Sequence, residues 1–462
     1  MSTARLFLPF VGLLLFALPS LAQITPLSSR FDPAVETFAF IIPNQRGLIG
    51  AGDIKAEACG ECHKSIYAQW KRSTHASALS DIQFQAELSK PDSPRWLCLN
   101  CHIPVQNQRD SIVVGLANND IFRPVMKPNP RFDPAMQQEG VTCATCHIRA
   151  TGPNGASVIL GPTGDTHAPH PVKEARVFLR NMCDRCHDPK GDDLTPNLIC
   201  WFTTKQELAE GQPDIVARYG KNRDCVDCHM PEKQGHAADD YTLLPEKPVN
   251  RHFWVGGGIP KRYGGYDDLV RRGYRSALDI RVTDISADSS GVGAVVHLTN
   301  ERAGHYLPTG DPERFILVRA ELIDSTGEVL KDASLRVGQE WLWNPARKVG
   351  DNRLKQGETR PWHIRLGVTD NEDLSALRVS ALHIRVTSGN AAYLMAAKGI
   401  DESLLPNGAD LVQEALDHYP LATWIHNEVI DIQTGRRSAA SPAELVDLST
   451  KEKGIPLSER HH

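Results

Sequence analysis

The pentapeptide Cys59-Gly60-Glu61-Cys62-His63 decides the fold, because four further copies of its pattern follow along the chain. In every copy two cysteines stand three positions apart and a histidine follows the second one. The other copies are Cys98-Leu99-Asn100-Cys101-His102, Cys143-Ala144-Thr145-Cys146-His147, Cys183-Asp184-Arg185-Cys186-His187 and Cys225-Val226-Asp227-Cys228-His229. This spacing is the attachment signature of haem c, in which both thiols bind one porphyrin edge and the histidine is the proximal iron ligand. The sequence therefore predicts five covalently bound haems c.

Zinc binding and thiol redox chemistry account poorly for the cysteine pairs. Given the cysteine and histidine content, chance would produce such a pentapeptide roughly 0.01 times per chain. Zinc ribbons use cysteine pairs without a histidine fixed after each pair. A thioredoxin-like motif would occur once, in a βαβ unit. The eleventh cysteine, Cys200, stands outside the pattern.

The N-terminus has the form of a signal peptide. Arg5 precedes an apolar run at 6–18, and Ser20-Leu21-Ala22 gives a cleavage site. The run is short for a transmembrane helix, although an uncleaved anchor is the alternative. We expect residues 1–22 to be removed, the mature chain to have no stable membrane span, and the protein to lie in the periplasm or outside the cell. The formal charge of −5 disfavours nucleic-acid binding.

The haem motifs divide the chain into segments of similar length. Successive motif histidines are 39, 45, 40 and 42 residues apart, as in a repeat with one haem per segment. We expect a lead-in at 23–58 and a pentahaem domain at 59–274. Many Pro and Gly residues in the haem segment predict short helices joined by long loops. The expected fold class of this domain is therefore mainly α and loop-rich.

A different pattern begins near residue 275. Apolar residues alternate with polar ones from Leu278 and again from Ile316, and Ser325-Thr326-Gly327 predicts a hairpin turn. We expect a small antiparallel β-sandwich domain at 275–390. The remaining segment, 391–462, is expected to be helical, with a capping box at Ser441-Pro442-Ala443-Glu444.

The second axial ligand of each iron decides between carrier and enzyme, because an iron with two protein ligands has no free position. The five histidines expected to supply this ligand are His75, His170, His236, His252 and His305. His75 lies 12 residues past His63, which is roughly 18 Å along a helix, so it should serve a different haem. His167 is an open alternative, and His297 falls inside a predicted strand.

Several segments resemble a family of bacterial multihaem c-type cytochromes that includes the tetrahaem acceptor of electrons from hydroxylamine oxidoreductase. The matching segments are 59–76, 140–147, 170–172, 228–231, 252–253 and 304–310. The resemblance implies closely packed, mostly bis-histidine haems, with distal roles for His75, His170, His252 and His305. A fifth haem and the sandwich depart from the tetrahaem member, so its partner is not carried over.

These observations favour periplasmic or extracellular electron transfer between a redox-protein donor and acceptor. The negative charge predicts partners with basic docking patches. Two alternatives stay open. One is a reductase or oxidoreductase of a small nitrogen or sulfur compound with one open haem. The other is a subunit of a conductive extracellular filament. The oligomeric state does not follow from the sequence.

Overall fold

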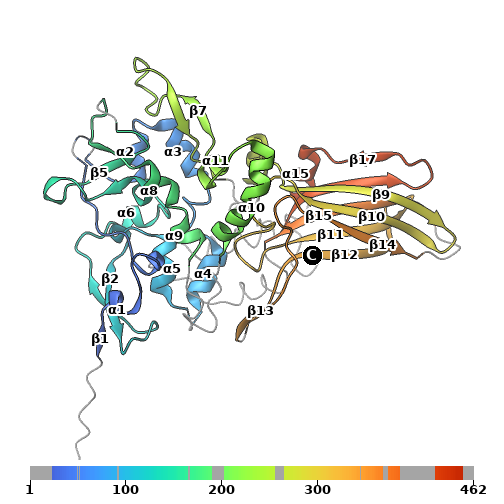
Figure 1. The fold of residues 1–462 in the computed structure, drawn as a ribbon, viewed down its shortest axis with the longest axis horizontal. Helices are drawn as coiled ribbons and strands as arrows, with labels where there is room; N and C mark the ends of the chain where they lie inside the picture. The colour runs from blue at the N-terminus through green and yellow to red at the C-terminus, as the bar shows by residue number, and fades with distance from the viewer. Residues whose placement is uncertain are drawn as a thin grey trace, which may run out of the picture.

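The computed structural model of the chain describes residues 23–48, 50, 52–90, 93–164, 167–189, 202–254, 265–343, 345–367, 373–385 and 422–450. The predicted signal peptide and Cys200 lie outside the described residues. Figure 1 shows two parts side by side, one with short helices and small sheets and one with long strands, and α10 stands between them. We refer to them as the haem part (23–271) and the sandwich (278–450). None of the helices described is both long and apolar enough to cross a membrane.

Short helices and three small sheets make up the haem part. Its helices are α1 Leu27–Arg30, α2 Ala56–Gly60, α3 Lys64–Lys71, α4 Ile82–Ser89, α5 Arg95–His102, α6 Pro134–Gln137, α7 Cys143–His147, α8 Arg176–Asn181, α9 Asp184–His187, α10 Thr204–Tyr219, α11 Cys225–His229 and α12 Gly265–Arg271. Its strands are β1 Ile24–Thr25, β2 Ser111–Ala117, β3 Pro124–Pro128, β4 Ile148–Arg149, β5 Val158–Gly161, β6 Val172–Glu174, β7 Glu232–Gly235 and β8 Lys247–Asn250. They form the sheets β1-β2-β3, β4-β5-β6 and β7-β8.

The prediction of a mainly α fold was wrong. Of the described residues, 26% are helical and 34% lie in strands. Most helices of the haem part, including those that carry the motifs, are only one or two turns long. Several connections that we expected to be loops pair as strands, and some are only two residues long, such as β1 and β4. A two-residue strand has no periodic pattern that sequence reasoning can detect.

Two antiparallel sheets build the sandwich. One has the order β14-β10-β9, and the other has the order β13-β12-β11-β15-β16-β17. The strands are β9 Leu278–Asp288, β10 Gly291–Asn300, β11 Phe315–Asp324, β12 Val329–Trp343, β13 Ala346–Asp351, β14 Thr359–Leu366, β15 Leu374–Ile384, β16 Ala422–Asp431 and β17 Arg437–Ala439. The alternating runs at Leu278 and Ile316 are strands as predicted. The hairpin β11-β12 turns at Gly327, where φ is 90° and glycine fits best.

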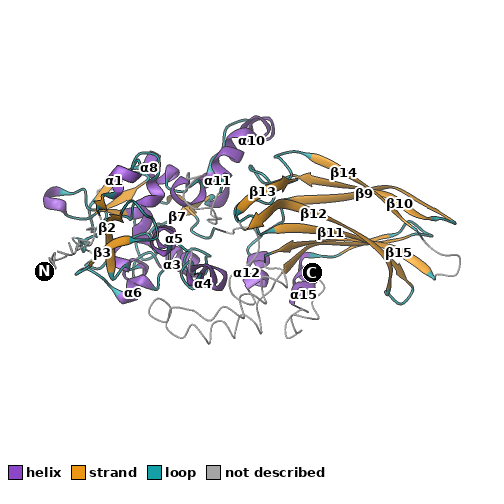
Figure 2. Ribbon diagram, turned by 90° about the horizontal axis from the view of Figure 1, so that it is seen from below, coloured by secondary structure: helices purple, strands orange, loops and turns teal. Residues whose placement is uncertain are grey.

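The described residues of the predicted helical segment, 422–450, are only partly helical, which corrects the second part of the predicted fold. Strand β16 pairs with β15 along its length, so the tail completes the larger sheet. Helix α15, Pro442–Thr450, begins at the predicted proline. The Ser441 amide donates to the Glu444 carboxylate at 2.7 Å, and the Glu444 amide donates to Ser441 Oγ at 3.3 Å, which is the predicted capping box. Figure 2 shows α12 and α15 at the end of the sandwich nearest the haem part.

The two parts are stabilised differently. The sandwich has one large core to which both sheets contribute, with Val296, Val318 and Val379 fully buried, and a small second cluster around Leu382 and Ile384. The described residues of the haem part form only three small apolar clusters. These clusters surround a cavity of about 2760 Å³, far above the roughly 300–1,000 Å³ of a site for one small ligand. The haem part therefore has room for several large groups where a core would otherwise lie.

Candidate haem centres

The cavity gathers every predicted site residue. All ten motif cysteines line it, and so do the five histidines that follow them. The five predicted distal histidines, His75, His170, His236, His252 and His305, line it as well. The ten motif cysteines form no disulfides. In a motif helix the two cysteines, three positions apart, lie on one face. Below, sites 1 to 5 denote the five motifs in chain order.

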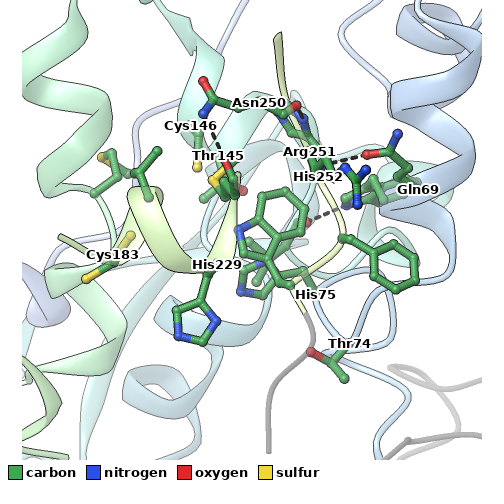
Figure 3. Close-up of a pocket in the computed structure, with 18 of the residues that line it drawn as sticks. Gln69, Thr74, His75, Thr145, Cys146, Cys183, His229, Asn250, Arg251 and His252 are labelled. Carbon is green, nitrogen blue, oxygen red and sulfur yellow. Dashed lines mark hydrogen bonds between the residues drawn. The ribbon is translucent and has the colours of Figure 1, made fainter. Parts of the chain in front are cut away.

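Four motif histidines face a second histidine across the cavity. At site 1 the ring centroids of His63 and His170 are 6.4 Å apart. The corresponding distances are 6.0 Å for His147 and His252 at site 3, and 6.2 Å for His187 and His75 at site 4. At site 5 the rings of His229 and His305 are 6.3 Å apart and almost parallel, at 6°. Figure 3 shows His75, His229 and His252 directed into this shared space.

These distances fit an iron held between two imidazoles. A ligating imidazole nitrogen lies about 2 Å from its metal, and the ring centre lies about 1.1 Å further back. Two such ligands on opposite sides therefore place their ring centres roughly 6.2 Å apart. The four measured distances, 6.0 to 6.4 Å, bracket this value. The cavity and the donor set both fit haem.

Hydrogen bonds orient several of these imidazoles. A backbone carbonyl can only accept, so a ring nitrogen bonded to it carries the proton. Five rings make this contact through Nδ1, at 2.6 to 2.9 Å: His63 to Ala237, His102 to Ala78, His147 to Leu160, His252 to Asn250 and His305 to Tyr306. Nε2 is then the unprotonated nitrogen, which is the form that binds a metal.

Burial keeps five of the predicted ligand histidines neutral. It lowers the pKa of His229 and of His252 to about 4. It also lowers the pKa of His147, His187 and His305. The cause is the same in each case, because removal from water disfavours the charged imidazolium. At neutral pH these side chains therefore present neutral imidazole to the cavity.

Site 2 has a different environment. The ring that the structure stacks on His102 is that of Phe84 from α4, at 3.4 Å between centroids and 1° between planes. His236 is next to Ala237, whose carbonyl accepts a hydrogen bond from the His63 ring. His236 therefore lies behind the His63 ring, whereas His170 faces its front. The assignment of His236 as a distal ligand stays a prediction.

Two aromatic residues near the ligands were missed from the sequence. Trp254 has its ring centroid 4.7 Å from that of His75 and 5.3 Å from that of His252. It therefore packs against both of the histidines that face the motif histidines of sites 3 and 4. Phe84 was missed for the same reason as Trp254: an apolar aromatic residue in a helix or loop carries no sign that a histidine will lie against it.

Contacts between the motifs place the sites in order. The side chains of Cys59 and Cys143 lie beside each other, which joins sites 1 and 3. The thiol of Cys183 contacts that of Cys225, joining sites 4 and 5, and Cys101 contacts Cys186, joining sites 2 and 4. Sites 3 and 4 are joined by Arg149, whose Nη2 lies 3.6 Å from the Met182 sulfur. Every site therefore lies next to at least one other.

Comparisons with known proteins agree with this interpretation. The family model described as cytochrome c554 and c-prime matches residues 58–148, which include sites 1 to 3. Among solved structures, a penta-heme cytochrome c552 from Thermochromatium tepidum has a similar fold, with a TM-score of 0.54 and 18% identity. The match covers 83% of this chain and 100% of that one. No curated protein matches the chain.

Together, the motifs, the cavity and these comparisons support a multihaem c-type cytochrome with haem c as its cofactor. The family match over residues 58–148 supports electron transfer by haem c as the general function, and hence redox partners. The structural match, at 18% identity, shows a similar fold. The expected tetrahaem relative is not singled out by either comparison.

Proposed function

We propose that the protein is a pentahaem electron carrier of the periplasm or the cell exterior. The observation that carries the proposal is the set of four histidine pairs whose ring centres lie 6.0 to 6.4 Å apart. When bound, haem c supplies an iron that takes up and releases one electron. Two imidazoles on an iron leave it no position for a substrate, so these four sites suit electron transfer.

The contacts between motifs support a path through the protein. They give the order 1–3–4–5, with site 2 beside site 4. Site 1 and site 5 would then be the two ends of the path. At sites 3 and 5 burial keeps both imidazoles of the pair neutral. Donor and acceptor are expected to be redox proteins with basic docking patches, because the chain is acidic.

Carbon monoxide binding by the fully reduced protein tests the proposal. Carbon monoxide binds only an iron with a free or weakly held position. Its addition should therefore leave the visible absorption of at least four of the five haems unchanged. Coulometric reduction of the same sample should take up five electrons per chain. Binding of carbon monoxide at two or more haems, or uptake of fewer than five electrons, would contradict the proposal.

A further inference from the structure

The contact between α10 and the sandwich surrounds the loop that carries His305. Glu207 of α10 is ion-paired with Arg353 of the sandwich, with 2.6 Å between Oε1 and Nη1. The two side chains are only 4% and 5% exposed. Arg353 also donates to both carboxylate oxygens of Asp351 at 2.9 Å. A fully buried pair with its remaining hydrogen bonds satisfied fixes the mutual position of the elements that carry it.

The same carboxylate holds the loop after His305. Thr309 Oγ donates to the second Glu207 oxygen at 2.6 Å. Thr309 Oγ also lies 2.9 Å from the hydroxyl of Thr204, at the first turn of α10. The Tyr306 hydroxyl donates to Glu210, one turn further along the helix, at 2.5 Å. His305 is thus followed by two residues whose side chains are bound to α10.

The backbone before His305 also touches the helix. A Cβ placed on Gly211 would lie 2.6 Å from the Gly304 carbonyl oxygen, closer than real Cβ contacts come. A Cβ on Gly304 would meet the side chains of Leu208 and Ile215 at 3.0 Å. Glycine is needed at 211 for this approach, and a side chain at 304 would crowd Leu208 and Ile215. The loop is therefore fixed to α10 on both sides of the histidine.

The middle of helix α10 is also fixed to the segment that leads into site 5. Gln212 donates to the Arg223 carbonyl at 2.7 Å and accepts from the Arg223 amide at 3.3 Å. Arg223 lies two residues before Cys225, the first cysteine of site 5. One helix therefore contacts both the distal loop and the segment that leads into the proximal motif. Figure 1 shows α10 in this position, between α11 and the sandwich.

The ring geometry at site 5 is unlike that of the other three pairs. The planes of His229 and His305 differ by 6°, whereas the other pairs are tilted by 39° to 49°. A parallel arrangement requires the distal ring to be held in rotation as well as in distance. The angle between two axial imidazole planes shapes the low-spin ferric resonance of the iron between them, so this site has its own spectroscopic signature.

We propose that Glu207, Arg353 and Thr309 form a latch that positions His305 parallel to His229 at site 5. The inference rests on the proposed function, because it takes His305 to be an iron ligand. It assigns the sandwich a role in electron transfer, since the sandwich supplies one axial ligand and the latch holds that ligand in place. The three latch residues are positioning residues and touch neither iron nor substrate.

The test uses electron paramagnetic resonance of the oxidised holo-protein. Glu207→Gln keeps the shape of the side chain and removes the charge that Arg353 requires. The expected result is a shift of one low-spin resonance, with part of its intensity converted to a high-spin signal, and four unchanged haems. Thr309→Val removes two hydrogen bonds, to Glu207 and Thr204, and no charge, and should shift the same resonance less. It is the variant to use if Glu207→Gln does not fold. Asp288→Asn, which breaks a pair with Arg365 on the exposed face of the sandwich, should leave all resonances as in the wild type.

His305→Met separates the latch from the ligand assignment. A change at a single haem in this variant supports His305 as a ligand, and an unchanged spectrum overturns that assignment. If His305→Met changes the spectrum but Glu207→Gln and Thr309→Val both match the wild type, the latch is overturned and the ligand assignment stands. A shift in Asp288→Asn as large as that in Glu207→Gln would also overturn the latch.

Discussion

A buried ion pair between the two parts gives a prediction with a defined magnitude. Arg385 of the sandwich is paired with Asp81, with side-chain exposures of 2% and 6%. Asp81 also accepts the Phe84 amide at 2.9 Å and so caps α4. In Arg385→Met the carboxylate stays buried without its cation. Removing one partner of a buried pair costs about 3–5 kcal/mol, which is a fall of roughly 6–20 °C in the melting temperature of a unit the size of the sandwich.

Scanning calorimetry of the holo-protein measures this effect, and a double variant separates charge from packing. In Asp81→Asn with Arg385→Met no charge is left buried, and asparagine still caps the helix. The double variant should therefore melt above the single one. Because α4 carries Phe84, which stacks on His102, the visible spectrum of one haem should change in the single variant. A single variant that melts within about 1–2 °C of the wild type would refute the reasoning, since it would place the cost below 1 kcal/mol.

The haem part gives three further predictions. His252→Met should raise the reduction potential of one haem, because thioether ligation favours the ferrous state. Spectroelectrochemical titration measures this potential, and five unaltered potentials would contradict the assignment of His252 as a ligand at site 3. Burial raises the pKa of Glu139 to about 7. Between about pH 4.5 and 7 the folded protein therefore keeps a proton that the unfolded chain has released, so the free energy of unfolding should fall as pH rises through this range. Glu139→Gln should flatten this decline in melting temperature between pH 5 and 8, and equal slopes for both proteins would contradict the assignment. Cys143→Ala with Cys146→Ala, which prevents attachment at site 3, should make the haem part sensitive to trypsin while the sandwich persists; equal resistance of both parts would show that the haem part folds without its full set of haems.

The attachment sites could be predicted from the sequence because thioether formation requires a fixed spacing of cysteines and histidine. The pairing of the ligands could not. His63 faces His170, and His187 faces His75, although the partners stand 107 and 112 positions apart in the chain. Such contacts depend on how the segments pack around the cavity, which no local pattern records. The place of His75 opposite His187 is compatible with its being too far along the chain from His63 to serve site 1.

Some strands could likewise be predicted from local sequence, and others could not. Strands β9 and β11 have one face on the sandwich core, so their apolar residues alternate and the sequence predicts them. In the haem part β4 and β6 are only two and three residues long. Strands this short cannot show an alternating pattern of apolar and polar residues. Strand β16 was assigned to a helical tail, although it pairs with β15 deep in the larger sheet. Its partner is distant in sequence, and that pairing rather than its own composition determines its structure.

Ferric electron paramagnetic resonance of the wild-type protein, with the haem content of the same sample measured, tests the central claim most directly. The histidine pairs at sites 1, 3, 4 and 5 predict four low-spin irons with two imidazole ligands among five haems per chain. One of the four should carry the signature of parallel rings, from His229 and His305. Fewer than four low-spin irons, or fewer than five haems, would contradict the account.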